Sequence, residues 1–126
     1  MTTYTYSYLQ LPVNADEGFP QAFHLTLGNA SYTISLQVTV ADEELLRDGE
    51  PLRLPLPGAF MVMTVAREGS GQAGVIFRRK LVLAHEYAAA ELAFVVKEIV
   101  VDPRNLNAAG AFGSLVTAGV AARWAL

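Results

Sequence analysis

The strongest constraint on the fold is a strict alternation of apolar and polar residues on both sides of Gly28-Asn29. Apolar side chains recur at every second position from Phe23 to Leu27, and again from Tyr32 to Val40. A period of two is typical of half-buried β-strands. A two-residue loop that contains glycine favours a primed hairpin turn, because glycine supplies the positive φ. The sequence therefore predicts an antiparallel hairpin.

The two-residue loop also predicts the register of this hairpin. It places opposite each other residues whose numbers add up to 57, so apolar side chains share one face. A slip of one residue would turn every side chain over and pair apolar with polar positions. The expected pairs are Leu25 with Tyr32, Phe23 with Ile34, His24 with Thr33, and Thr26 with Ser31.

Further strands are expected before and after the hairpin. Alternating tyrosines predict a strand from Tyr4 to about Leu11, which the turn-rich segment 14–20 ends. Residues 42–49 fit either one helical turn or a long acidic turn. Three prolines, Pro51, Pro55 and Pro57, exclude a central strand between them and leave an edge strand or a loop.

The second half of the chain also favours strands. Residues 60–65 and 75–83 are expected to pair across the flexible loop 68–74, and residues 116–125 to form a closing strand. Residues Tyr87–Val101 are ambiguous, because alanines favour helix at their start and β-branched residues favour strand at their end. We predict a short helix or turn at 87–91 and a strand from Leu92. Residues 1–126 then form a single β-rich domain, a small antiparallel barrel or sandwich of about six to eight strands with at most one short helix.

The composition is short of charge. Apolar residues make up 52% of the chain and charged residues 17%, with a net charge of −3 and a mean hydropathy of +0.31. This excludes a disordered chain and a basic nucleic-acid binder. Because few polar residues are available to cover the surface of a small domain, we expect protein partners, as a homo- or hetero-oligomer. The alternative is a monomer whose alanines and glycines inflate the apolar count.

No targeting or membrane segment is predicted. The N-terminus lacks the basic and apolar regions of a signal peptide. The uncharged run 105–122 is long enough to span a membrane, but it contains asparagines, glycines and hydroxyl residues, and its apolar members are mostly alanine. We therefore expect no membrane partner.

Catalytic and metal motifs are incomplete. With no cysteine there is no disulfide, thiolate metal site or cysteine nucleophile. The glycine spacing in 69–74 matches a dinucleotide loop, but a strand follows it instead of a helix. His85-Glu86 lacks a second histidine, and Ser70, His85 and Asp102 lack a nucleophile elbow. An enzyme would need His85, Glu86 and Glu91 brought together. We predict no catalytic residue, no metal and no cofactor, and therefore no enzyme.

Two charged clusters have simpler explanations. Arg78-Arg79-Lys80 divides between two faces of a strand and is expected to protect a sheet edge. The five acids between 42 and 50 lack the spacing of a calcium loop and are expected to face solvent or a basic partner.

Contacts with a partner are expected where apolar residues lack neighbouring charge. The tyrosines 4, 6 and 8 fit either a docking stripe or the buried face of a strand. The remaining candidates lie in the apolar segments 57–65 and 112–124. The predicted contact residues are Tyr4, Tyr6, Tyr8, Phe60, Met61, Met63, Phe112, Leu115 and Trp124.

The hairpin carries a family resemblance. The segment from Gln21 to Leu36, QAFHLTLGNASYTISL, resembles the opening hairpin of small β-barrel plug proteins in the baseplates of contractile-tailed phages. Gly49-Glu50-Pro51-Leu52 and Pro57-Gly58 are loosely similar to the next segments of that family. The resemblance implies a non-enzymatic virion subunit of the tail or baseplate, assembled in the host cytoplasm, that packs around the central tube or hub.

Two other functions stay open on the sequence. One is a capsid-associated decoration protein. The other is a small β-barrel module that binds an apolar ligand in a cavity lined by Phe23, Leu25 and Ile34.

Overall fold

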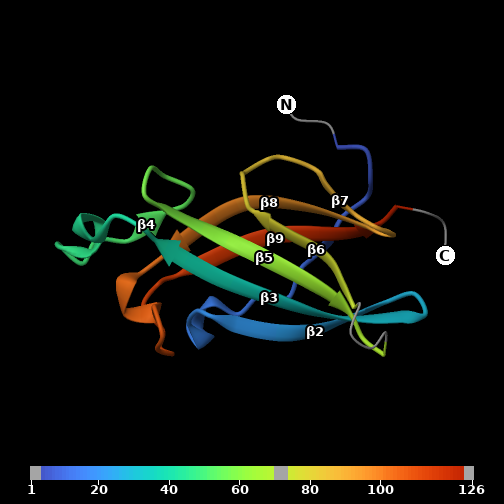
Figure 1. Cartoon of the computed structure of the whole chain (residues 1–126), viewed down its shortest axis with the longest axis horizontal. Helices are drawn as coiled ribbons and strands as arrows, with labels where there is room; N and C mark the ends of the chain where they lie inside the picture. The colour runs from blue at the N-terminus through green and yellow to red at the C-terminus, as the bar shows by residue number, and fades with distance from the viewer. Residues whose placement is uncertain (1–3, 70–73, 124–126) are drawn as a thin grey trace.

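The chain is a sandwich of two antiparallel β-sheets in a computed structural model that describes residues 4–69 and 74–123 (Figure 1). The expected mostly-β fold is confirmed, as a sandwich and not as a closed barrel. One sheet has the order β2 (Gln21–Leu27), β3 (Ala30–Val40), β5 (Ala59–Arg67) and β6 (Val75–Lys80). We call it the hairpin sheet.

The second sheet is built around β8 (Leu92–Val101). Its order is β1 (Leu9–Gln10), β9 (Leu115–Ala122), β8 and β4 (Leu52–Arg53), and β7 (Tyr87–Ala89) also pairs with β8. We call it the terminal sheet, because it contains the first and last strands of the chain.

The predicted hairpin is confirmed in every pair. β2 and β3 pair antiparallel with Leu25 opposite Tyr32 and Phe23 opposite Ile34, and the polar pairs fall as expected. Gly28 has a φ of 63°, which meets the need of a primed turn for a positive φ at its first central position. The hairpin thus turns its apolar face towards the other sheet.

The core lies between the two sheets. β3 and β5 supply every second side chain to it, as their alternating burial shows, and β8 and β9 supply the opposite layer with residues such as Phe94, Val96 and Val120. Burial of apolar area is the main driving force for such packing. The largest fully buried side chains include Tyr32, Phe19, Phe94, Ile34, Leu36, Leu54, Met61 and Met63.

Helical structure in the described residues is limited to three 3-10 turns, Ala15–Glu17, Glu43–Leu46 and Pro103–Asn105. Of the two alternatives for 42–49, a helical turn or a long acidic turn, the structure has a helical turn, of the 3-10 type, at Glu43–Leu46. Asp42 caps it, because its side chain accepts a hydrogen bond from the backbone of Glu44. No helix in this part of the chain is long and apolar enough to cross a membrane.

The helix considered at 87–91 is wrong. Residues 87–89 are strand β7, and Ala90 and Glu91 form the turn into β8, with Ala90 at a φ of 53°. Pairing with β8 buries Tyr87 and Ala89, and this tertiary gain overrides the helix propensity of the alanines.

The N-terminal strand is much shorter than predicted. β1 comprises only Leu9–Gln10, and residues 4–8 lie outside any strand. The prolines act as expected, since β4 is a two-residue strand at the edge of the terminal sheet. The pairing of β5 with β6 is confirmed, and the closing strand is β9, which spans Leu115–Ala122.

Candidate functional site

An ionic cluster joins the two sheets at one end of the sandwich. Glu91 lies in the turn between β7 and β8, and Arg67 ends β5. The Arg67 guanidinium donates from Nε at 3.1 Å and from Nη2 at 2.5 Å to the two Glu91 oxygens. The Tyr32 hydroxyl, from β3, donates to the same carboxylate at 2.5 Å. The cluster therefore ties the hairpin sheet to the terminal sheet.

The pKa values of Glu91 and Tyr32 shift in opposite directions. Hydrogen bonds from Arg67, and then from Tyr32, lower the pKa of Glu91 to about 2. Burial, together with the bond to Glu91, raises the pKa of Tyr32 to about 12. Glu91 is thus ionised and Tyr32 protonated across the physiological range, and neither is poised to exchange a proton near pH 7.

A second carboxylate holds the N-terminal segment. Glu86 accepts hydrogen bonds from the backbone and hydroxyl of Thr5 at 2.9–3.1 Å and from the Tyr8 hydroxyl at 2.6 Å. The bond from Tyr8 is the main cause that lowers the pKa of the Glu86 carboxyl, followed by backbone and side-chain bonds from Thr5 and opposed by burial. We call residues 4–8 the N-terminal arm.

The arm lies against the outer face of the terminal sheet. Gly119 of β9 faces it so closely that a Cβ atom there would come within 2.8 Å of the Tyr8 Cβ. Ala93, Val95 and Ala121 are 0–3% exposed. They lie outside the cluster between the sheets, which takes the alternate β8 residues Leu92, Phe94 and Val96. We infer that the arm helps to cover these outer residues, because a strand directs successive side chains to opposite faces.

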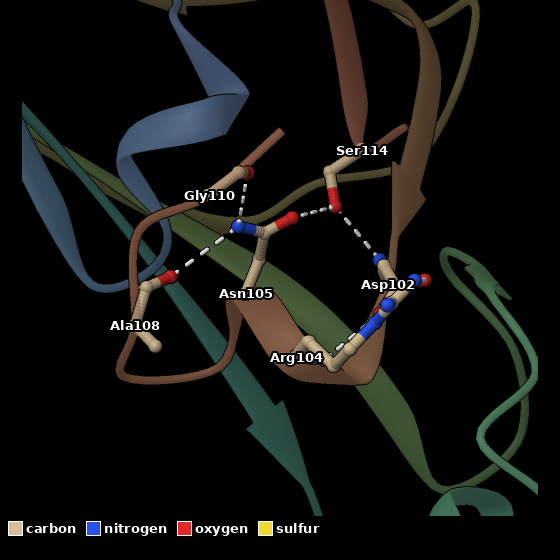
Figure 2. A network of polar contacts seen from close by, with 6 residues as sticks. All are labelled: Asp102, Arg104, Asn105, Ala108, Gly110 and Ser114. Carbon is tan, nitrogen blue, oxygen red and sulfur yellow. Dashed lines mark hydrogen bonds and ion pairs between the residues drawn. The ribbon is translucent and has the colours of Figure 1, made fainter. Parts of the chain in front are cut away.

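A third polar cluster shapes the loop before β9 (Figure 2). Asn105 is fully buried, and its amide nitrogen donates to the carbonyls of Ala108 at 3.3 Å and Gly110 at 3.0 Å. Its amide oxygen accepts from the Ser114 hydroxyl at 2.6 Å, and Ser114 Oγ in turn accepts from the Asp102 backbone. In the described residues no buried side-chain nitrogen or oxygen lacks a partner. The cluster therefore joins the loop before β9 to itself and to Asp102 at the end of β8, and we call it the Asn105 tie.

Arg104 links this tie to a predicted contact residue. Its guanidinium donates to the Asp102 carboxylate at 3.0 and 3.2 Å and lies 4.3 Å from the centre of the Phe112 ring. The Arg104 side chain is the main cause that lowers the pKa of Asp102. Phe112 is half-buried beneath this cation and is held in place by it.

The residues that an enzyme would need each have another partner. Glu86 serves the arm, and Glu91 serves the cluster at the sandwich end. The His85 ring packs edge-on against Tyr87, with centroids 4.5 Å apart, and Asp102 is paired with Arg104. Ser70 lies outside the described residues. Within residues 4–69 and 74–123, no three histidine or carboxylate side chains gather where they could hold a metal ion.

Besides Phe112, five of the nine predicted contact residues are half-buried or exposed. The three arm tyrosines are half-buried and touch one another edge-on, with Tyr8 5.8 Å from Tyr4 and 6.4 Å from Tyr6. Phe60 is half-buried on the outer face of β5, with the Lys80 ammonium 4.9 Å from its ring. Leu115 is 47% exposed.

Met61 and Met63 need a correction. Both are at most 1% exposed and point between the sheets, because they share a face of β5 with the buried Ala59 and Val65. They are core residues and present no surface to a partner. Trp124 lies outside the described residues.

Sequence reasoning missed the other exposed apolar residues. Leu9 is 61% exposed, Val75 58%, Val82 49% and Leu83 37%. Leu9 and Val75 lie on outermost strands, and Val82 and Leu83 lie between β6 and β7. Strand order, which single-sequence alternation does not give, would have been needed to find them.

The space proposed for an apolar ligand is filled by the protein itself. Ile34 is fully buried, and Phe23 and Leu25 pack against the core cluster between the sheets.

No protein-family model matches the chain, and no curated protein or solved structure has significant similarity to it.

Proposed function

We propose that this chain is a non-enzymatic structural subunit of a tailed-phage particle, associated with the tail or baseplate. The observation that carries the proposal is the position of the exposed apolar side chains. Leu9 lies on the edge strand β1, Val75 on the edge strand β6, and Leu115 on β9 beyond the residues that pair with β1. Sheet edges are the places where a neighbouring protein adds its own backbone and side chains.

The ionisable groups support a structural role. Glu86 and Glu91 each hold one segment of the chain against another, and the Asp102 carboxylate pairs locally with Arg104. Their lowered pKa values suit carboxylates that stay ionised as hydrogen-bond acceptors and not proton transfer near pH 7. The type of particle is supported by the resemblance of residues 21–36 to the opening hairpin of baseplate plug proteins.

Deletion of the gene in the phage or prophage that carries it tests the proposal. A structural tail subunit is required for the particle itself, so deletion should abolish finished particles and leave unfinished ones, seen by electron microscopy. Expression of the intact chain from a plasmid should restore them. Particles of normal form and infectivity without the chain would refute the proposal. Finished heads and tails that lose only their resistance to heat or low salt would instead favour the decoration protein.

A further inference from the structure

The two edges of the hairpin sheet differ in charge. β6, at one edge, ends in Arg78-Arg79-Lys80, and such charges discourage pairing with another strand. β2, at the other edge, has the sequence QAFHLTL, with no acidic residue, lysine, arginine or proline. Figure 1 shows β2 as the outermost strand at the bottom of the view, with no described strand beyond it. The β2 edge therefore lacks the usual protection.

The free hydrogen-bonding groups of β2 can be assigned to individual residues. A two-residue hairpin loop closes on a pair that exchanges two hydrogen bonds, here Leu27 with Ala30, and such pairs alternate along the strands. The bond from the Glu68 backbone N–H to the Ser31 carbonyl, at 2.9 Å, confirms this alternation. It shows that the Ser31 carbonyl points away from Thr26, the residue opposite Ser31 on β2. The backbone groups of Ala22, His24 and Thr26 thus point to the open edge.

We propose that this edge binds β2 of a second copy of the chain, as an antiparallel pair centred on His24. The proposal rests on the assembly role above and names one contact within it. A two-fold axis at His24 places Ala22 opposite Thr26 of the other copy, and the three residues with free backbone groups face the same three residues. Two such strands satisfy each other with about six hydrogen bonds.

The side chains match in the same register. On the inner face Phe23 meets Leu25 of the other copy, and both are half-buried against the core. On the outer face the small Ala22 meets Thr26 across the axis. The His24 side chain is 80% exposed and already bonded to Glu68, Nδ1 to Oε2 at 2.6 Å, so each copy carries a hydrogen-bond partner beside its central histidine.

The β6 edge of a neighbour fits β2 less well. Phe77 of β6 points into the core, and Arg79 shares its face because the side chains of a strand alternate. Pairing β6 with β2 would bring Arg79 beside Phe23 and Leu25, and removing a guanidinium from water without a partner is costly. A second β2 introduces no such charge.

The solution mass of charged edge variants tests the contact. The pairing is small compared with a standard interface, so the intact chain should shift from monomer to dimer at roughly 100 µM or above, by light scattering. His24→Lys should remain monomeric at the same concentration, because the two-fold axis places the two added ammonium groups directly opposite each other. Gln37→Lys is the matched control, since Gln37 is exposed on the interior strand β3, and it should dimerise like the intact chain. Equal dimerisation of all three, or a monomeric intact chain, would overturn the proposal.

Disulfide trapping tests the register directly, because the chain has no cysteine of its own. In the proposed pair, the Cα atoms of residue 22 in one copy and 26 in the other lie about 5.5 Å apart, within reach of a disulfide. Ala22→Cys mixed with Thr26→Cys should therefore give a mixed disulfide dimer. Either variant alone should not form a disulfide dimer, because the cysteines of its two copies would be offset by four residues along the paired strands. Equal trapping in all three samples, or none, would contradict the register. Either failure leaves the gene-deletion result untouched, so it would remove this contact without removing the assembly role.

Discussion

Glu91 is the residue that joins the two sheets through charge. Its folded-state pKa of about 2 lies below the ordinary value of 4.5 for a glutamate. A depressed carboxyl pKa contributes stability that is fully present above about pH 4.5 and is lost as the pH falls towards 2. The Glu91 carboxylate should therefore account for part of the acid sensitivity of the fold.

Replacing Glu91 tests this assignment. Glu91→Gln should lower the free energy of unfolding at pH 7 by about 1–3 kcal/mol, because Arg67 and Tyr32 lose an ionised acceptor. The difference from the intact chain should shrink below about pH 4.5, because Glu91 of the unfolded chain then takes up a proton while Glu91 of the folded chain, with a pKa of about 2, is still ionised. Urea unfolding at pH 7 and pH 3 measures both. Glu44→Gln, in an exposed pair with Arg47, is the control and should change little. A loss that is equal at both pH values would contradict the ionic role.

Asn105 is the residue that organises the loop before β9. Asn105→Asp keeps the shape but sets carboxylate oxygens against the carbonyls of Ala108 and Gly110. We expect a loss of about 2–4 kcal/mol in the free energy of unfolding, since a buried site loses two donors and gains a charge. Asn107→Asp, at an exposed position with a φ of 68°, should cost far less. Equal thermal shifts for the two variants would show that the cluster is not a tie.

At the scale of elements, the N-terminal arm is the segment most dependent on a single side chain. Glu86 accepts from Thr5 and Tyr8, whereas the arm forms no strand pairing of its own before β1. A segment held by few contacts opens at low free energy.

Glu86→Gln should therefore loosen the arm without unfolding the sandwich. The Thr5 amide should exchange with solvent several-fold faster in hydrogen-exchange measurements, while amides in β3 and β5 keep their protection. Glu98→Gln, in an exposed pair with Arg53, supplies the comparison and should leave Thr5 unchanged. Unaltered exchange at Thr5 in Glu86→Gln would mean that other contacts hold the arm.

The elements also show what the sequence could predict. The β2–β3 hairpin was predictable to the residue, because alternation and a two-residue loop leave one register that hides apolar side chains. β7 was not, since its alanines favour helix locally and become strand only through pairing with β8. The arm tyrosines alternate like a strand, yet hydrogen bonds to Glu86, 78–81 residues away, hold them outside one.

The contact residues were predictable only in part for the same reason. Apolar content led to Met61 and Met63, which the alternation of β5 turns into the core. Leu115 was found, but Leu9 and Val75 are revealed only when the order of the strands shows which ones lie at the edges. The hydrogen bonds of Glu91 join residues far apart in the sequence, and those of Asn105 lie in an irregular loop. Neither set follows the period-two pattern of a strand, so the sequence could not predict them.

At the scale of the whole molecule, the chain is a two-layer sandwich, and ion pairs and buried hydrogen bonds join its own segments. Apolar residues and one uncharged strand are left at the sheet edges. The internal bonds stabilise the sandwich itself, and the open edges are the places where the proposed assembly would add a neighbour.

The most direct test of this account is the number of copies of the chain in purified particles. The proposed function places the gene in a phage or prophage. Particles of that phage would be washed at high salt, and the chain would be quantified by mass spectrometry against a known tail protein. A structural subunit should be present at a fixed whole-number ratio that repeated washing does not change. If the chain is absent from finished particles, or if its ratio falls with each wash, the account is contradicted.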